Sequence, residues 1–116
     1  MEIWINPACS KCRTATAVLD EAGIDYTVRR YLDDPPTAAE LDDVLVRMGL
    51  EPWDIARMTE KPAAALKGLP RDAAHRADWI AAMVADPILI QRPILTAADG
   101  TTVVGREPES LARVIG

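Results

Sequence analysis

The chain has few cysteines, one histidine and too few basic residues to balance its acidic ones. Its 116 residues include two cysteines, a single histidine (His75), and 13 Lys and Arg against 18 Asp and Glu, which gives a net charge of −5. An acidic chain is a poor non-specific nucleic-acid binder, because the affinity for nucleic acid comes mainly from Lys and Arg that contact phosphates. One histidine and two cysteines cannot complete a four-ligand zinc site within one chain. We therefore expect neither a nucleic-acid partner nor a metal.

Long apolar segments are also missing. The apolar runs fall far short of the roughly 20 residues that a membrane span requires, and residues 1–4 (MEIW) contain no basic or apolar leader pattern. We expect no membrane contact, no signal peptide and a cytoplasmic location. At 49% hydrophobic and 27% charged residues the composition supports a packed core, and the length suits one domain.

The periodicity predicts the element order β-α-β-α, further helices, then β-β-α. Strands are expected at 3–5, 25–31, 94–96 and 101–104; helices are expected at about 10–22, 37–48, 76–85 and from 108 onward, with a short one near 51–58. Thr37 and Glu40 form a capping box, and Asp99-Gly100 is a hairpin turn signal. Residues 61–76 have no clear period, which indicates a mobile loop with one weak helical turn. This order predicts a small α/β sheet flanked by helices.

Cys9 and Cys12 form a C-x-x-C motif at the turn between the first predicted strand and the first predicted helix. If the helix begins near Ser10, its unpaired N–H groups and its dipole favour the Cys9 thiolate. The same N–H groups form an anion site of the kind that holds phosphate. Cys12 is three residues on, within disulfide reach, and could attack an oxidised or modified Cys9. The alternative is a pair of thiols without function.

The residues around the motif have two interpretations each. Lys11 and Arg13 either tune the thiol and bind an anion or are ordinary helix-surface charges. Ser10 is a residue at the helix start or an oxyanion contact, and Asn6 either bonds near the thiolate or only shapes the turn. We include all four in the candidate site.

Three segments carry a resemblance to a known family. Residues 6–13 (NPACSKCR) resemble the active-site turn of the ArsC/Spx family, residues 86–94 (DPILIQRPI) resemble its H-P-x-L-I-x-R-P-I stretch, and residues 31–36 (YLDDPP) match as well. The resemblance spans the whole chain. It implies a single thioredoxin-like domain, 1–116, with a helical insertion at about 35–86, in which Pro93 is a cis-proline facing the cysteine turn.

Within this family the chain is similar to the glutaredoxin-linked arsenate reductases, which use a nucleophilic cysteine and three arginines. The resemblance assigns these roles to Cys9 and to Arg57, Arg92 and Arg106. Arsenate is a dianion near neutral pH, so an attacking thiolate needs fixed positive charge, and a guanidinium grips two oxygens at once. Without the resemblance, these would be three ordinary surface arginines.

The resemblance implies reduction of arsenate to arsenite by a monomer that has no bound cofactor. Electrons would come from an external thiol, either glutathione with glutaredoxin or thioredoxin. Cys12 has no counterpart in the single-cysteine reductases, so it could resolve the Cys9 adduct internally. One alternative is an Spx-like redox-switch regulator that binds RNA polymerase through the Cys9–Cys12 pair; such regulators lack the arginine at the position of Arg106. Another is a family member that reduces a different thiol substrate.

Overall fold

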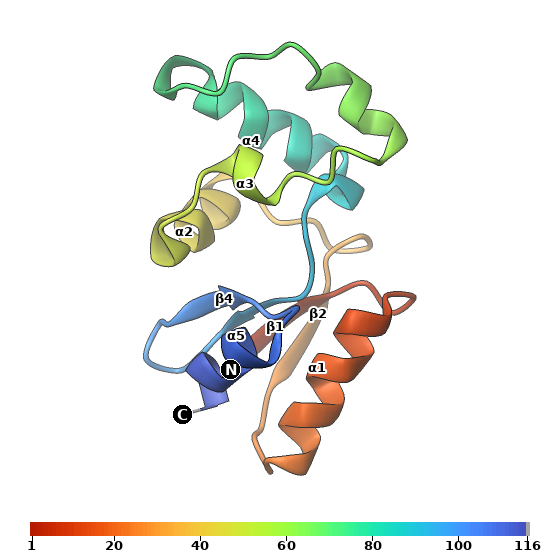
Figure 1. Cartoon of the computed structure of the whole chain (residues 1–116), viewed down its shortest axis with the longest axis vertical. Helices are drawn as coiled ribbons and strands as arrows, with labels where there is room; N and C mark the ends of the chain where they lie inside the picture. The colour runs from red at the N-terminus through yellow and green to blue at the C-terminus, as the bar shows by residue number, and fades with distance from the viewer. Residues whose placement is uncertain (116) are drawn as a thin grey trace. The chain divides into compact units, whose positions relative to one another are not determined.

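The computed structural model of the chain describes residues 1–115 and has the predicted element order (Figure 1). The strands are β1 (Glu2–Ile5), β2 (Thr27–Arg30), β3 (Ile94–Thr96) and β4 (Thr102–Val104). The helices are α1 (Ser10–Glu21), α2 (Ala38–Met48), α3 (Pro52–Ile55), α4 (Arg76–Ala85) and α5 (Pro108–Ile115), with 3₁₀ turns at Lys61–Ala65, Ala73–His75 and Pro87–Leu89. Each of these helices is too short or too polar to span a membrane.

The chain folds as two compact units. The first contains Met1–Asp34 and the segment from Arg92 onward, and the second contains Pro35–Gln91. The predicted insertion, about 35–86, falls within the second unit. The single domain expected over 1–116 stays a prediction.

The first unit is built on a four-stranded mixed sheet in the order β2-β1-β3-β4. β1 is parallel to β2, with Ile5 opposite Arg30, and antiparallel to β3, with Trp4 opposite Ile94. β4 is antiparallel to β3, with Val104 opposite Ile94. The last residues of β1, β2 and β4 and the first residue of β3 therefore meet at one edge of the sheet, which we call the site edge. This is the expected thioredoxin-like arrangement.

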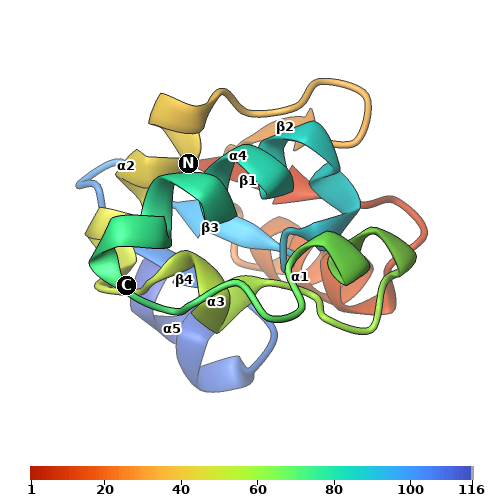
Figure 2. The ribbon, with the colours of Figure 1, turned by 90° about the horizontal axis from the view of Figure 1, so that it is seen from above.

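α1 and α5 pack on the same face of this sheet (Figure 2). Because side chains alternate along a strand, the register Ile3–Leu95–Val103 places one residue of each of three strands on that face. The buried cluster between the sheet and the helices consists of Ile3, Ala15, Leu19, Leu95, Val103, Leu111 and Val114. Burial of each large aliphatic side chain contributes about 1.5–3 kcal/mol, so this cluster fixes α1, which begins directly after Cys9, against the sheet.

The second unit contains α2, α3 and α4. The Thr37 hydroxyl accepts the Glu40 N–H at 3.1 Å and the Glu40 carboxylate accepts the Thr37 N–H at 2.9 Å, so the predicted capping box is confirmed. Gly49 ends α2 with φ of 68°, a left-handed conformation that favours glycine. Trp79 of α4 is buried and meets Trp53 of α3 edge-on, with ring centroids 6.0 Å apart.

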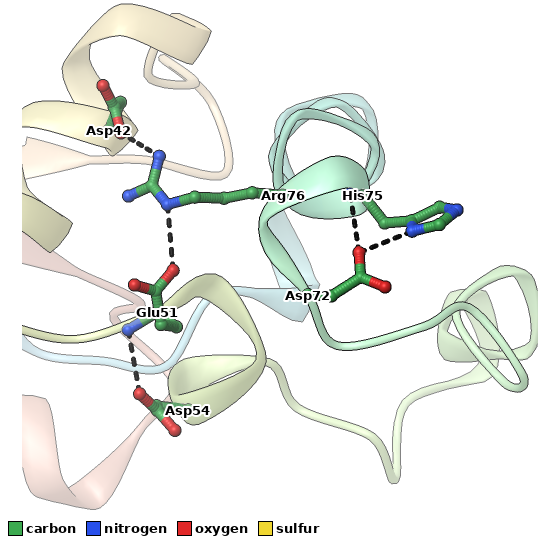
Figure 3. Close-up of polar contacts among 6 residues, drawn as sticks. All are labelled: Asp42, Glu51, Asp54, Asp72, His75 and Arg76. Atoms are coloured by element: carbon green, nitrogen blue, oxygen red, sulfur yellow. Dashed lines mark hydrogen bonds and ion pairs between the residues drawn. The ribbon is translucent and has the colours of Figure 1, made fainter.

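Arg76, the first residue of α4, joins the three helices of this unit (Figure 3). Its Nε donates to Glu51 Oε2 at 2.9 Å, and its Nη1 binds Asp42 of α2. Glu51 precedes α3, and its backbone N–H donates to Asp54 Oδ2 at 2.8 Å. One guanidinium therefore fixes the start of α4 against both α2 and α3.

Residues 61–76 differ from the prediction of one weak helical turn, because they form two 3₁₀ turns. Pro62 sits in the first turn of the first one, where its missing N–H costs nothing. Asp72 caps the second by accepting the His75 N–H at 3.0 Å, and its carboxylate also lies 2.6 Å from His75 Nδ1. The Asp72 cap therefore supports a regular 3₁₀ turn in a segment that has no hydrophobic period.

Candidate functional site

Cys9 is the N-cap residue of α1 and follows β1 by a tight turn at the site edge. The turn is closed by Asn6, whose carbonyl accepts the Cys9 N–H at 2.9 Å and whose Oδ1 accepts the Ala8 N–H at 3.0 Å. The side chain of Cys9 itself is half-buried. Its sulfur therefore lies at the start of α1, where the helix has N–H groups without partners in the helix.

The geometry around Cys9 favours its thiolate. Burial raises the pKa of Cys9, but hydrogen bonds from the Cys12 N–H, the Arg92 side chain and the Lys11 N–H outweigh it and lower that pKa from 9.0 to about 6. Two of these donors are the helix-terminal N–H groups that the sequence predicted. At neutral pH most of the Cys9 side chain is therefore the nucleophilic thiolate.

Cys12 is the opposite kind of thiol. It is buried on the inner side of α1, with 1% of its surface exposed. Burial and the neighbouring Cys9 charge raise its pKa, the Asn6 N–H, 3.4 Å from Cys12 Sγ, lowers it, and together they bring it to about 11. The two sulfurs are hydrogen-bonded to each other and are not joined in a disulfide. The pair thus consists of one ionised and accessible thiol and one protonated and buried thiol.

Arg92 reaches the same site from the neighbouring strand, β3. It precedes β3, is 9% exposed, and its guanidinium binds both the Cys9 sulfur and the Tyr31 side chain. Burial lowers the pKa of Arg92, but the interactions with Cys9 and Tyr31 raise it above its ordinary value, so the guanidinium stays charged. The Arg92–Pro93 peptide bond is cis, as the resemblance implied.

Arg106 follows β4 and is therefore also at the site edge. Its Nη1 donates to the backbone carbonyl of Arg92 at 2.7 Å. Within the first unit the structure thus joins Arg106 to the backbone of Arg92, and the Arg92 side chain to Cys9.

Arg57 lies in the second unit, so its expected place beside Cys9 stays a prediction. Its Nη1 donates to Gln91 Oε1 at 2.7 Å, and its Nε lies 3.5 Å from Glu60 Oε1. The backbone on both sides is fixed as well: the Arg57 N–H donates to Leu89 O at 2.7 Å, and the Gln91 N–H donates to Ile55 O at 3.0 Å. All of these partners of Arg57 belong to the second unit.

The remaining candidates lie on the first turn of α1. Ser10, Lys11 and Arg13 are exposed. Lys11 acts on Cys9 through its backbone N–H. The Arg13 Nη1 donates to Pro7 O at 3.2 Å, so this guanidinium braces the cysteine turn. The Ser10 carbonyl accepts the Thr14 hydroxyl at 3.0 Å.

Tyr31 was not among the residues that the sequence singled out. The sequence presented it as the last residue of a predicted strand and the first residue of the family-like segment 31–36, without a role at the site. The structure places it directly after β2 at the site edge, fully buried and bound to Arg92. The available signal was its position, because parallel strands β1 and β2 must carry Cys9 and Tyr31 out at the same edge.

The arrangement offers a nucleophile and positive charge at one point. A thiolate, two guanidiniums and helix N–H groups can bind a tetrahedral oxyanion and stabilise the charge that develops when sulfur attacks it. Within residues 1–115, no three His, Cys, Asp or Glu side chains come together in a group that could hold a metal ion.

Comparison with known proteins finds related chains over nearly the whole length. The model of the ArsC family matches residues 4–114. A Streptomyces viridochromogenes protein described as "Uncharacterized protein in glnII region" is 59% identical over 113 residues, which is 96% of this chain and 95% of the relative. An arsenate reductase of Neisseria meningitidis serogroup A is 33% identical over 99% of this chain and 97% of its own.

The fold is likewise similar to that of solved structures. A structure described as arsenate reductase from Vibrio cholerae superposes with a TM-score of 0.86 at 33% identity and covers 98% of both chains. This structural similarity covers nearly the whole chain.

Proposed function

The chain belongs to the ArsC family, and we propose that it is a thiol-dependent arsenate reductase with Cys9 as its nucleophile. The observation that carries the proposal is the Cys9 sulfur, held as a thiolate at the start of α1 by helix N–H groups and by Arg92. Relatives of similar length are named arsenate reductases, which fits this assignment.

In the first step the Cys9 thiolate attacks the arsenic atom of arsenate. An S–As bond forms, one As–O bond breaks, and the oxygen leaves as water after protonation. Arg92 and Arg106 offset the repulsion between the thiolate and the anion and bind the remaining oxygens. Arg57 is the third guanidinium of the proposed oxyanion site, and Ser10, Lys11 and Arg13 line its entrance.

In the second step a second thiol attacks the Cys9 sulfur. An S–S bond forms, the S–As bond breaks, and its electron pair stays on arsenic, which is reduced from As(V) to As(III) and leaves as arsenite. Cys12 is the proposed second thiol because its side chain is hydrogen-bonded to that of Cys9. Its proton passes to the leaving arsenite, and a Cys9–Cys12 disulfide remains.

An external dithiol then reduces that disulfide and returns both cysteines to the starting state. A thioredoxin-like or glutaredoxin-like protein fits this role, since the disulfide of a C-x-x-C motif exchanges readily with such a partner. The Cys12 pKa of about 11 means that its thiol leaves this exchange protonated at neutral pH.

Arsenite formation by the purified protein tests the proposal. The protein is incubated with arsenate and either the glutathione–glutaredoxin system or the thioredoxin system, and arsenite is measured directly. We expect turnover by the wild type and none by Cys9→Ser. Equal background rates for the two proteins with both reductants would exclude the reductase.

The role of Cys12 is tested separately with Cys12→Ser. Internal resolution requires that this variant forms the arsenic adduct but does not turn over with thioredoxin. Unchanged turnover would assign the second thiol to the external reductant instead.

The second candidate function is a redox-switch regulator that binds RNA polymerase through a surface next to the cysteine pair. The hydrogen-bonded Cys9 and Cys12 sulfurs support it, since they are prepared to form a switchable disulfide. Arg106 at the site favours the reductase. A pull-down of the polymerase α subunit with the reduced and the oxidised protein distinguishes the two, and no binding in either state would remove the regulator.

A further inference from the structure

Tyr31 presents a buried polar group at the candidate site. It is 0% exposed, which is unusual for a tyrosine, because its hydroxyl must then find a partner within the protein. The chain bends away directly after it, as the Asp33 and Asp34 N–H groups both donate to Arg30 O, at 3.0 and 2.9 Å. Tyr31 is therefore held at the end of β2 by the strand on one side and by a turn on the other.

Arg92 is a hydrogen-bond partner of the Tyr31 side chain. β1 lies between β2 and β3 in the sheet, so residues leaving β2 and entering β3 flank the residue that leaves β1. Tyr31 and Arg92 occupy these flanking places, and Cys9 follows β1. The guanidinium consequently has the Cys9 sulfur and the Tyr31 oxygen as two fixed partners.

A guanidinium with two such partners has little freedom to rotate. The guanidinium is planar and rigid and turns as one unit, so a hydrogen bond to Tyr31 limits the positions from which it can reach Cys9. Arg106 adds a third constraint, because it binds the Arg92 backbone carbonyl at 2.7 Å. The backbone of Arg92 is thus fixed by Arg106, whereas its side chain is fixed by Tyr31.

We propose that Tyr31 is a positioning residue whose phenolic oxygen accepts a hydrogen bond from the Arg92 guanidinium and thereby holds that guanidinium on the Cys9 sulfur. The effect on catalysis rests on the proposed function, because Arg92 would be the group that receives the arsenate oxygens. The effect on the thiol does not, because it needs no arsenate.

Tyr31→Phe tests the proposal, with Tyr26→Phe as the matched control. These are the two tyrosines of the chain, and the Tyr26 hydroxyl donates to Asp20 Oδ1 at 2.7 Å on the surface. The rate of Cys9 alkylation by iodoacetamide is followed against pH, with the modified peptide identified by mass spectrometry. Each change is the loss of one oxygen atom, so differences in packing are small.

Loss of the Tyr31 hydroxyl is expected to raise the alkylation midpoint of Cys9 by about one pH unit, which is a tenfold weaker preference for the thiolate. Arsenate turnover should fall about tenfold in kcat/KM. Tyr26→Phe should leave both at the wild-type values. In an Arg92→Met protein, adding Tyr31→Phe should have no further effect on the midpoint, since Tyr31 acts through Arg92.

An unchanged Cys9 midpoint in folded Tyr31→Phe would overturn the proposal, even if the variant were less stable. If Tyr31→Phe does not fold, 3-fluorotyrosine in the Tyr26→Phe protein replaces it, since Tyr31 is then the single site of incorporation. Fluorination weakens the phenolic oxygen as an acceptor, so a raised Cys9 midpoint is expected, and no shift would overturn the proposal. If the Cys9 midpoint shifts in Tyr31→Phe but the wild type does not turn over arsenate, the proposed reductase function is rejected and the role of Tyr31 is retained.

Discussion

Arg106 binds the backbone carbonyl of Arg92 at 2.7 Å, so one site arginine fixes the main chain of the other. Arg92 in turn binds the Cys9 sulfur. The two residues are 14 positions apart in the sequence and meet because β3 and β4 form a hairpin whose open end lies at the site edge. Their proposed roles can therefore be separated: Arg92 contacts the thiol directly, whereas Arg106 is proposed to act on the anion alone.

Arg106→Ala is expected to reduce arsenate turnover by roughly 10²-fold, because a donor aimed at developing charge is lost. The alkylation midpoint of Cys9 should change little, since Arg106 is not among the groups that lower the Cys9 pKa. Arg113→Ala, which removes an exposed charge in the last turn of α5, is the control. A Cys9 midpoint that moved as far in Arg106→Ala as in Arg92→Ala would contradict this separation.

Cys9 should make the stability of the protein depend on pH. Its pKa is about 6 in the folded protein and near 9.0 in the unfolded chain, so the folded state binds fewer protons between these values. The stabilisation is complete above pH 9 and is lost as the pH falls through about 6. The free energy of unfolding of the wild type relative to Cys9→Ser should therefore rise from pH 6 to 8.5. Urea titrations at several pH values measure it.

Cys12 sets the highest pH at which this stability difference can be assigned to Cys9. The pKa of Cys12 is about 11 in the folded protein, so above pH 9 the unfolded chain releases a proton that the folded state retains, and this destabilises the fold. Between pH 6 and 8.5 Cys12 stays protonated in both states. A difference between wild type and Cys9→Ser that is constant over this range would contradict the low Cys9 pKa.

Gly105→Ala should destabilise the first unit by about 1–3 kcal/mol, the usual cost of overpacking a core. A Cβ at this position would lie 2.4 Å from Leu95 Cδ1 and 2.9 Å from Leu111 Cδ2. Both leucines are buried, so they have little room to move. Thermal unfolding measures the loss. Adding Leu95→Val should cost less in the Gly105→Ala protein than in the wild type, and strictly additive effects would argue against the clash.

Arg76→Met should lower the free energy of unfolding by about 1 kcal/mol. This loss is smaller than for a buried ion pair, because the Arg76 side chain is 25% exposed. It loses two carboxylate partners, Asp42 and Glu51, that belong to separate elements (Figure 3). Arg47→Met is the control, because its i,i+4 pair with Asp43 lies within α2 and is worth about 0.3–0.5 kcal/mol. Equal losses in the two variants would show that Arg76 does not join the helices.

Local sequence signals predicted most of the fold. The Thr37–Glu40 capping box, the Asp99-Gly100 turn and Pro108 at the start of the last helix are all confirmed. Each depends on a few neighbouring residues whose hydrogen bonds or dihedral preferences are the same in any context. Residues 61–76 were less predictable, because their two 3₁₀ turns depend on capping by single residues such as Asp72 rather than on a hydrophobic period.

The candidate site was only partly predictable in the same terms. The C-x-x-C motif at a helix start indicated a low Cys9 pKa from local geometry alone. Arg92 and Arg106 came from the resemblance, since nothing local distinguishes them from other arginines before the register of β3 and β4 is known. The place of Tyr31 required the pairing of β2 with β1. The position of Arg57 relative to Cys9 stays a prediction.

The opposite ionisation of the two thiols has an electrochemical consequence. Between pH 6 and 11 the reduced pair carries one proton, on Cys12. Opening a Cys9–Cys12 disulfide in this range would take up two electrons but a single proton, so the midpoint potential would fall by roughly 30 mV for each pH unit. Acidification below pH 6 would double that slope, and the driving force available from a reductant would then respond more steeply to the acidity of its surroundings.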